Sequence, residues 1–160
     1  MKLIMKWLTT NDPTKKFAIE CQLMALFSGR SRFLRKYFQR RIFYRYGCDI
    51  SHTARIDESV VFGHPLCVVI GSNAVIERSC RIYQGVTVGA NLAGDNSMPL
   101  IKQNTTVCAG AKLIGGIVIG ENCIIGANAV VTKNVPDDSV VVSANKIISN
   151  KSAPAGLNSR

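Results

Sequence analysis

Only two histidines occur among the 160 residues, and one of them, His64, stands in the apolar stretch FGHPLCVVIG (residues 62–71). An imidazole titrates near neutral pH, so such a ring can accept a proton from a reacting group. The same ring could also be a surface histidine on an irregular turn. Residue type alone favours neither interpretation, so the position of His64 in the fold has to decide between them.

Six cysteines are a second set of side chains that could do chemistry, at positions 21, 48, 67, 80, 108 and 123. They form no C-x-x-C pair and no zinc-type spacing, and we predict no metal site. We expect them to be small buried hydrophobic residues with free thiols, with Cys80 and Cys123 in the interior. Free thiols favour a reducing cytoplasm as the location.

The elements that would position His64 follow a six-residue repeat. One large aliphatic or aromatic residue recurs in each hexad: Ile50, Ile56, Phe62, Ile70, Ile76, Ile82, Val88, Ile101, Val107, Leu113, Ile119, Ile125 and Val131. The repeat slips by two residues after Phe62, around His64, and is interrupted again between Val88 and Ile101. An α-helix would need a period of 3.6 residues, so this spacing indicates a different fold.

A second slot of the hexad predicts corners. It holds Asn73, Asn91, Asn104, Asn122, Asn128 and Asn134, together with Gly85, Gly110 and Gly116. Asn and Gly tolerate positive φ, and short β-branched runs lie between these positions. The pattern predicts an all-β fold: a parallel β-helix of short strands, whose thirteen hexads make a little over four triangular coils, with a short helical segment before it.

Charge separates the N-terminal segment from the rest of the chain. Residues 1–46 hold eleven Lys and Arg against two acidic residues, a net charge of +9, whereas residues 47–160 carry only +1. We predict a basic helical segment over 1–47, a β-helix domain over 48–148 and a polar tail over 149–160.

Residues 30–47 are predicted to form a basic amphipathic helix with Phe33, Leu34, Tyr37, Phe38, Ile42 and Tyr46 on one face and Gly47 as C-cap. This helix could pack on the β-helix or on a neighbouring subunit, or it could contact an anionic membrane surface from the cytoplasmic side. No nucleic-acid-binding motif accompanies its charge, so nucleic acid is not an expected partner.

Two long stretches carry a family resemblance: HPLCVVIGSNAVIERSCRIYQGVTVG (residues 64–89) and CAGAKLIGGIVIGENCIIGANAVVTKNVPDDSVVV (residues 108–142). Together with the hexads, they resemble the hexapeptide-repeat acyltransferases, in the serine acetyltransferase-like branch. The resemblance covers about residues 48–148. It implies a left-handed β-helix, a homotrimer with active sites between subunits, and acetyl-CoA as co-substrate without a metal.

The resemblance also implies roles for individual residues. His64 matches the histidine general base, and Asp49 matches the aspartate fifteen residues before it that orients the ring. Because one coil takes about eighteen residues, we expect this pair to meet on one edge in adjacent coils. Coenzyme A is expected to contact Gly89, Ala90, Ala109, Gly110 and Ala127, with Lys133 and Lys146 near its phosphates.

The acceptor is the open question. Serine acetyltransferases have Asp-His where this chain has Gly63-His64, and Arg-His-Pro where it has Ser97-Met98-Pro99. That basic pair helps to hold a carboxylate. The sequence more closely resembles the sugar and capsular-polysaccharide O-acetyltransferases, so the preferred prediction is a sugar or glycan acceptor. The residues expected to contact this acceptor are Gly63, Asn91, Asp95 and Ser97. L-serine is the alternative.

Three other classes use this fold differently. A γ-type carbonic anhydrase needs three histidine ligands for its metal, and the chain has two histidines. An ice-binding ladder would need flat rows of threonine, which Thr87, Thr105, Thr106 and Thr132 do not form. A β-helix that binds or acts as a scaffold without catalysis stays open as an alternative.

Overall fold

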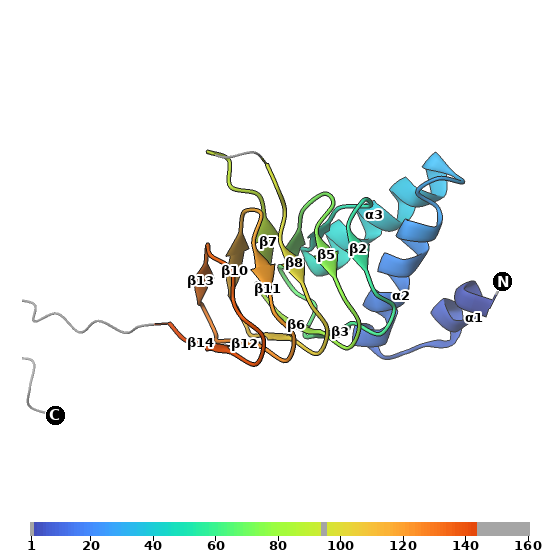
Figure 1. Cartoon of the computed structure of the whole chain (residues 1–160). Helices are drawn as coiled ribbons and strands as arrows, with labels where there is room; N and C mark the ends of the chain where they lie inside the picture. The colour runs from blue at the N-terminus through green and yellow to red at the C-terminus, as the bar shows by residue number, and fades with distance from the viewer. Residues whose placement is uncertain (1, 94–95, 144–160) are drawn as a thin grey trace, which may run out of the picture.

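Three helices come first in the computed structural model, which describes residues 2–93 and 96–143, and fourteen short strands follow them (Figure 1). The helices are α1 (Lys2–Thr9), α2 (Pro13–Leu26) and α3 (Arg32–Tyr46). The strands are β1 (Asp49–Ile50), β2 (Arg55–Ile56), β3 (Val61–Gly63), β4 (Val69–Ile70), β5 (Val75–Ile76), β6 (Arg81–Tyr83), β7 (Thr87–Gly89), β8 (Leu100–Ile101), β9 (Thr106–Val107), β10 (Lys112–Ile114), β11 (Val118–Ile119), β12 (Ile124–Ile125), β13 (Val130–Val131) and β14 (Val140–Val141). The predicted tail, residues 149–160, lies outside the described residues.

Successive strands go in turn to three parallel sheets that form the sides of a prism. Sheet A holds β1, β4, β7, β10 and β13, sheet B holds β2, β5, β8 and β11, and sheet C holds β3, β6, β9, β12 and β14. All the strand pairs in the described part of the chain are parallel, and Figure 1 shows the coils stacked along one axis. The predicted parallel β-helix is therefore confirmed, and β14 extends it beyond the last predicted hexad.

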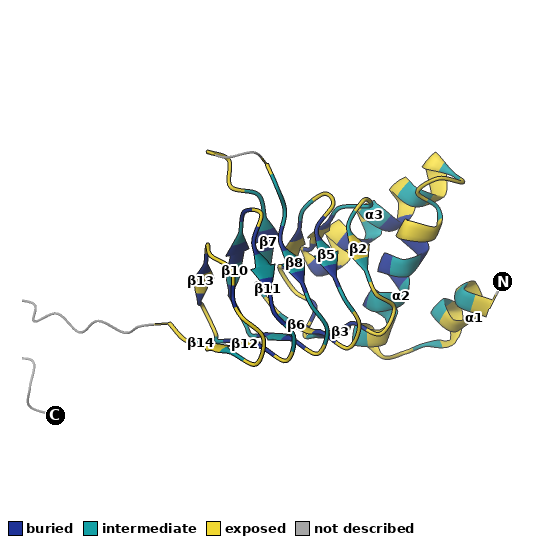
Figure 2. Cartoon of the chain, viewed as in Figure 1, coloured by how far each residue is buried: buried dark blue, intermediate teal, exposed yellow. Residues whose placement is uncertain are grey.

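The core of the prism is the repeated hexad position. Each of the thirteen predicted residues lies in a strand, and all of them are buried except Ile56, which is partly buried. Cys80 and Cys123 are buried beside them, as predicted. Figure 2 shows the buried positions on the inner side of the coils and exposed residues at the corners. The six-residue period thus identified the interior almost residue by residue.

Most of the predicted corners have the expected backbone. Asn73, Asn104, Asn122, Asn128, Gly85 and Gly110 all have φ between 54° and 71°. Asn91 and Asn134 do not have positive φ, and in the corner after β10 the residue with positive φ is Gly115 rather than Gly116. The predicted slot was wrong at these three positions, which all lie where sheet A passes to sheet B, in the insertion loop and in the two coils after it.

The helices close the N-terminal end of the prism, on the right in Figure 1. Phe17 of α2 packs edge-on against Tyr46 of α3 and Phe62 of β3, each at 4.9 Å between ring centroids. Helix α2 lies against β3, and α3 lies against β1. The helices therefore cover the apolar end of the first coil, which would otherwise be exposed to water.

A buried carboxylate joins the three helices. Glu20 of α2 is fully buried, and its Oε1 accepts hydrogen bonds from Trp7 Nε1 of α1 (2.9 Å) and Arg41 Nε of α3 (2.6 Å). The hydrogen bond to Glu20 raises the pKa of the Arg41 guanidinium. Within residues 2–93 and 96–143, no helix is long and apolar enough to cross a bilayer.

The predicted helix over residues 30–47 is found in place, but its predicted apolar face is only half right. Phe38, Ile42 and Tyr46 are buried, whereas the Phe33 side chain is 85% exposed and Tyr37 is 46% exposed. Leu34 is also exposed. The helix touches its neighbours along a narrow line, so aromatic residues away from that line face solvent. Contact of this surface with a membrane stays a prediction.

Candidate active site

His64 lies at the corner between β3 and β4, where sheet C passes to sheet A. The other corners of this edge need six residues from one core position to the next, but here Phe62 and Ile70 are eight residues apart. The two additional residues bring His64 into the left-handed region, with φ 55°, which is uncommon for a side chain of this size. The ring is exposed, so the slip in the repeat presents an imidazole to solvent.

Asp49 begins β1, one coil earlier on the same edge. The Asp49 N–H donates to the carbonyl oxygen of Val68 (2.9 Å), and the Cys67 N–H donates to the carbonyl oxygen of Tyr46 (3.3 Å). The turn that carries His64 therefore runs beside the segment that carries Asp49. Both side chains are exposed, and no hydrogen bond or ion pair joins them in the described part of the chain.

We call the corner line between sheets C and A the C–A edge; its members are Gly47, Cys67, Gly85, Gly110 and Asn128, each three residues before a core position. All five have φ between 54° and 71°. The N–H groups of residues 67, 85, 110 and 128 donate in turn to the carbonyl oxygens of Tyr46, Leu66, Gln84 and Ala109, at 2.8–3.3 Å. This ladder connects the end of α3 to the later coils, and it includes the turn that carries His64 through Cys67.

Three of the predicted coenzyme A residues lie along the C–A edge: Ala109, Gly110 and Ala127. Ala109 and Gly110 form the corner between β9 and β10, and Ala127 stands in the corner between β12 and β13. Gly110 has φ 71°, and a Cβ there would collide with the side-chain amide of Asn128. Glycine therefore fits closely under Asn128 here, and Ala109, Gly110 and Ala127 together present only backbone and methyl groups to a ligand.

The remaining predicted residues lie on the other edge of sheet A, where it passes to sheet B. Gly89 ends β7, Ala90 and Asn91 follow it, and Lys133 stands just after β13. Ser97 lies in the insertion loop before β8. One copy of the chain therefore separates these residues from His64 by the width of sheet A. Asp95 and Lys146 lie outside the described residues.

The second half of the insertion loop packs against the coils. A Cβ on Gly71 would collide with the Met98 side chain, and a Cβ on Gly116 would lie 2.5 Å from the Cβ of Ser97. Asn91 uses its Oδ1 locally, accepting from the Ala93 N–H at 3.1 Å. Gly116 and Gly71, which have no side chains, thus allow Ser97 and Met98 to pack closely against the coils. Met98 is partly buried against the core.

Comparison with known proteins finds a known repeat in these coils. Residues 98–133 match the model of the bacterial transferase hexapeptide, a run of six repeats. These coils are hexapeptide repeats. A serine acetyltransferase of Synechococcus elongatus is 42% identical over 97 residues, which cover 60% of this chain and 40% of that relative. The chain spans less than half the length of the curated relatives that it matches.

Solved structures resemble the whole arrangement, helices included. Serine acetyltransferase isoform 3 of Entamoeba histolytica, in complex with cysteine, superposes with a TM-score of 0.76 at 28% identity over 92% of this chain and 57% of the other. A serine acetyltransferase in complex with CoA has a TM-score of 0.70 at 30% identity over 78% of this chain and 52% of the other. The hexapeptide repeats therefore form a left-handed β-helix. The similar proteins are serine acetyltransferases, so the predicted closeness to sugar O-acetyltransferases is not supported.

A tyrosine that was not predicted from the sequence lies beside the corner of His64. The Tyr83 ring covers Gly63, and a Cβ on Gly63 would lie 2.8 Å from Tyr83 Cε1. Gly63 and Tyr83 are paired in register on β3 and β6. A pairing between coils of the hexapeptide repeats could have revealed this contact, because position 83 is one coil from position 63. An aspartate at position 63 would displace the ring.

A second missed residue is Lys112, on the outer face of sheet A. Its Nζ donates to the carbonyl oxygen of Gly85 (2.6 Å) on the C–A edge. In the register of the hexapeptide repeats, Lys112 lies between Thr87 and Val130. Cations were predicted only at Lys133 and Lys146, yet Lys112 contacts the ladder that includes the turn of His64.

The thiols divide into two groups. Burial raises the pKa of Cys21, Cys48 and Cys80, which disfavours their reactive thiolate form. Cys67 is exposed and Cys108 is partly exposed, both near the C–A edge. In the part of the chain that the structure describes, no group of three His, Cys, Asp or Glu side chains could hold a metal ion.

Proposed function

We propose that this protein is an acetyl-CoA-dependent O-acetyltransferase in which His64 acts as the general base and Asp49 orients its ring. The observation that carries the proposal is the irregular corner: two additional residues bring an imidazole onto the edge that also carries Asp49. Strained backbone of this kind is concentrated at functional sites. The similarity to serine acetyltransferases supports the same chemistry.

The reaction needs one proton transfer at this corner. His64 removes the proton of the acceptor hydroxyl while the hydroxyl oxygen attacks the thioester carbonyl. The tetrahedral intermediate collapses, the C–S bond breaks, and coenzyme A leaves as its thiol after the imidazolium returns the proton. Asp49 would keep one ring nitrogen protonated, so that the other is free to accept. No side chain of the protein is acylated in this scheme.

Acetyl-CoA would lie along the C–A edge. Ala109, Gly110 and Ala127 leave the backbone open to a narrow pantetheine arm. Backbone N–H groups of these corners that the ladder does not use could stabilise an oxyanion. Gly89, Ala90 and Lys133, on the other edge of sheet A, would contact the same ligand from a second copy, and Lys146 is a further candidate for its phosphates. A related serine acetyltransferase has been solved with CoA.

We therefore propose a homotrimer whose active sites lie between subunits. The support is geometric: the predicted residues are divided between two edges of one sheet, and a threefold arrangement can bring one edge of each copy to the other edge of its neighbour. Exposed Val61, Val69 and Val130 on the flat sides are consistent with packing between copies.

L-serine is the acceptor that the relatives favour, because the similar curated proteins are serine acetyltransferases. A sugar or glycan hydroxyl is the second candidate. The observation that favours it is the loop: Ser97 and Met98 offer no cation for a carboxylate, and Met98 packs on the coil. Gly63, Asn91, Asp95 and Ser97 remain the proposed acceptor contacts.

The test measures how fast the purified full chain releases coenzyme A thiol from acetyl-CoA. Parallel reactions contain L-serine, a neutral sugar or no acceptor, and mass spectrometry identifies the products. We expect an O-acetylated product, with L-serine the better acceptor. Turnover with sugars alone would assign the second candidate. The absence of transfer to any alcohol would overturn the proposal. Light scattering on the same sample tests the trimer.

A further inference from the structure

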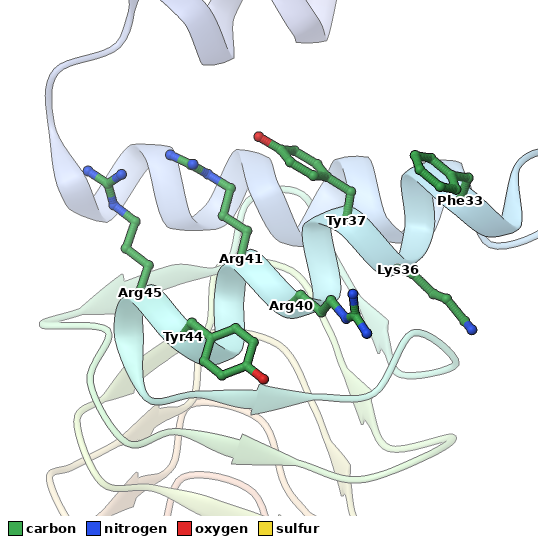
Figure 3. Close-up of a pocket in the computed structure, with 7 residues that line it drawn as sticks. All are labelled: Phe33, Lys36, Tyr37, Arg40, Arg41, Tyr44 and Arg45. Carbon is green, nitrogen blue, oxygen red and sulfur yellow. The ribbon is translucent and has the colours of Figure 1, made fainter.

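A basic cavity opens beside Asp49. Its volume is about 300 Å³, and its lining consists of Lys36, Gln39, Arg40, Phe43 and Tyr44 from α3 together with Asp49 from β1. A larger cavity of about 750 Å³ continues along the same helix and shares Lys36, Arg40 and Tyr44 with it. Figure 3 shows these three side chains extending from one side of α3, while Tyr37, Arg41 and Arg45 extend from the other.

The two cations of this cavity have no partner among the described residues. Arg35 donates to Gln39 Oε1 (3.0 Å) and Arg41 donates to Glu20 Oε1 (2.6 Å), whereas Lys36 and Arg40 make no hydrogen bond or ion pair there. Helix α3 itself contains no acidic residue. Lys36 and Arg40 are thus two positive charges that line a cavity together with Asp49, the residue proposed to orient His64.

The position of this cavity relative to His64 is set by the C–A edge. Gly47 is both the C-cap of α3 (φ 60°, N–H to the Phe43 carbonyl oxygen, 3.0 Å) and the first corner of the ladder. Cys67, in the turn of His64, is the next corner. The orientation of α3 against Asp49 and His64 is therefore determined by ladder hydrogen bonds rather than by a flexible linker.

We propose that Lys36 and Arg40 bind an anionic group of the acceptor, so that the substrate is an alcohol that also carries a carboxylate or a phosphate. This inference rests on the proposed acetyl transfer and adds the substrate class. The guanidinium fork of Arg40 matches either anion with two hydrogen bonds. Asp49 repels the anion toward Lys36 and Arg40, which leaves the hydroxyl at the end nearer His64.

The described residues of the insertion loop, 90–93 and 96–99, contain no Lys or Arg that could hold an anion. The positive charge near Asp49 lies on α3. The alternative occupant is an anionic membrane, since the Tyr44 side chain is 80% exposed and Phe43 is also exposed. A membrane would engage the whole basic face of α3 and would not depend on Arg40 in particular.

The decisive variant is Arg40→Gln, with two controls that remove the same charge from the same helix. Arg45 lines only the larger cavity, and Arg32 lines neither. Each variant is assayed for acetyl transfer to matched alcohols, L-serine against L-serinamide and glucose 6-phosphate against glucose. We expect wild type to prefer the anionic member of one pair. A hydrogen-bonded charge pair is worth about ten- to a hundredfold, so Arg40→Gln should raise KM for that acceptor by about this factor.

In the same assay, KM for acetyl-CoA should change less than about twofold in all three variants. The rise in KM in Arg40→Gln should be much smaller for the neutral acceptor than for the anionic one. Equal effects of Arg45→Gln or Arg32→Gln would overturn the proposal, as would a wild type that prefers the neutral alcohols. The two acceptor pairs distinguish a carboxylate from a phosphate.

Equilibrium binding separates this inference from the proposed function. L-serine and glucose 6-phosphate are titrated into the wild-type protein and the three variants, without acetyl-CoA, and followed by NMR. Binding that only Arg40→Gln weakens supports the anion site even if no acetyl transfer is found. Binding that is absent, or unchanged in Arg40→Gln, overturns it. Binding to phosphatidylcholine–phosphatidylglycerol vesicles is measured by sedimentation. If all three variants weaken vesicle binding equally, and neither L-serine nor glucose 6-phosphate binds, the surface is assigned to a membrane instead.

Discussion

Two corners on the C–A edge show how one repeat can either continue regularly or form a site. At the corner between β9 and β10, a single residue with positive φ, Gly110, completes the turn and stacks on its neighbours. At the corner between β3 and β4, Cys67 takes the equivalent place, and a two-residue addition puts His64 into the same strained region. Both corners keep the ladder hydrogen bond, so the ladder tolerates the insertion.

The difference shows where this fold accepts strain. Gly110 has no room for a side chain because Asn128 of the next coil covers it, so stacking dictates its residue type. His64 is exposed, so packing against the next coil does not dictate its residue type. A strained backbone conformation that does not contribute to stability is often found at functional sites. The predictions below test this contrast, in order of decreasing effect.

The largest effect is expected from His64→Ala. Loss of a general base lowers kcat by about 10²- to 10⁴-fold, with little change in the free energy of unfolding because the ring is exposed. Steady-state release of coenzyme A thiol measures it. His52→Ala is the matched control, since His52 is the other histidine and lies at a corner of sheets A and B. Unchanged turnover in His64→Ala would exclude the assignment.

Thiol labelling comes next. Cys67 and Cys108 should react with a thiol reagent in the native protein, whereas Cys21, Cys48 and Cys80 should react at least about a hundredfold more slowly. Burial both hides these three sulfurs and raises their pKa, so less thiolate is present at a given pH. Mass spectrometry after short labelling gives the sites. Fast labelling of Cys48 would show that the first corner opens.

Gly110→Ala should lower the free energy of unfolding by about 1–3 kcal/mol, because a Cβ at φ 71° is strained and meets Asn128. Denaturant unfolding measures the loss. Gly29→Ala is the control, since nothing lies within 4 Å of the Cβ position and its φ is not positive. If both variants lose the same stability, stacking does not dictate the glycine at the regular corner.

The smallest effect is expected at Cys67. Replacement by Asn, which tolerates positive φ, should raise the free energy of unfolding by about 0.5–1 kcal/mol at the irregular corner. Cys108→Asn is the control, because Cys108 does not have positive φ and should gain nothing. A Cys67→Asn variant that is less stable would show that the thiol packs usefully against its surroundings.

The six-residue period by itself determined the fold of residues 50–131, because each hexad must bury one large side chain and turn one corner. It also determined that His64 stands at a corner, since the repeat slips there. It did not determine that residues 33, 34 and 37 are exposed, because the partner of a helix face is not encoded in the helix. The Tyr83–Gly63 contact needed one further step, the strand register between coils, which places position 83 one coil after position 63.

Tertiary structure alone decided which residues share a surface. It placed Asp49 beside the turn of His64, divided the predicted coenzyme A residues between two edges of sheet A, and brought Lys36 and Arg40 to Asp49. The physical reason is that a repeat specifies its own period locally. What meets across coils, or between a helix and a coil, depends on long-range packing that no single repeat contains.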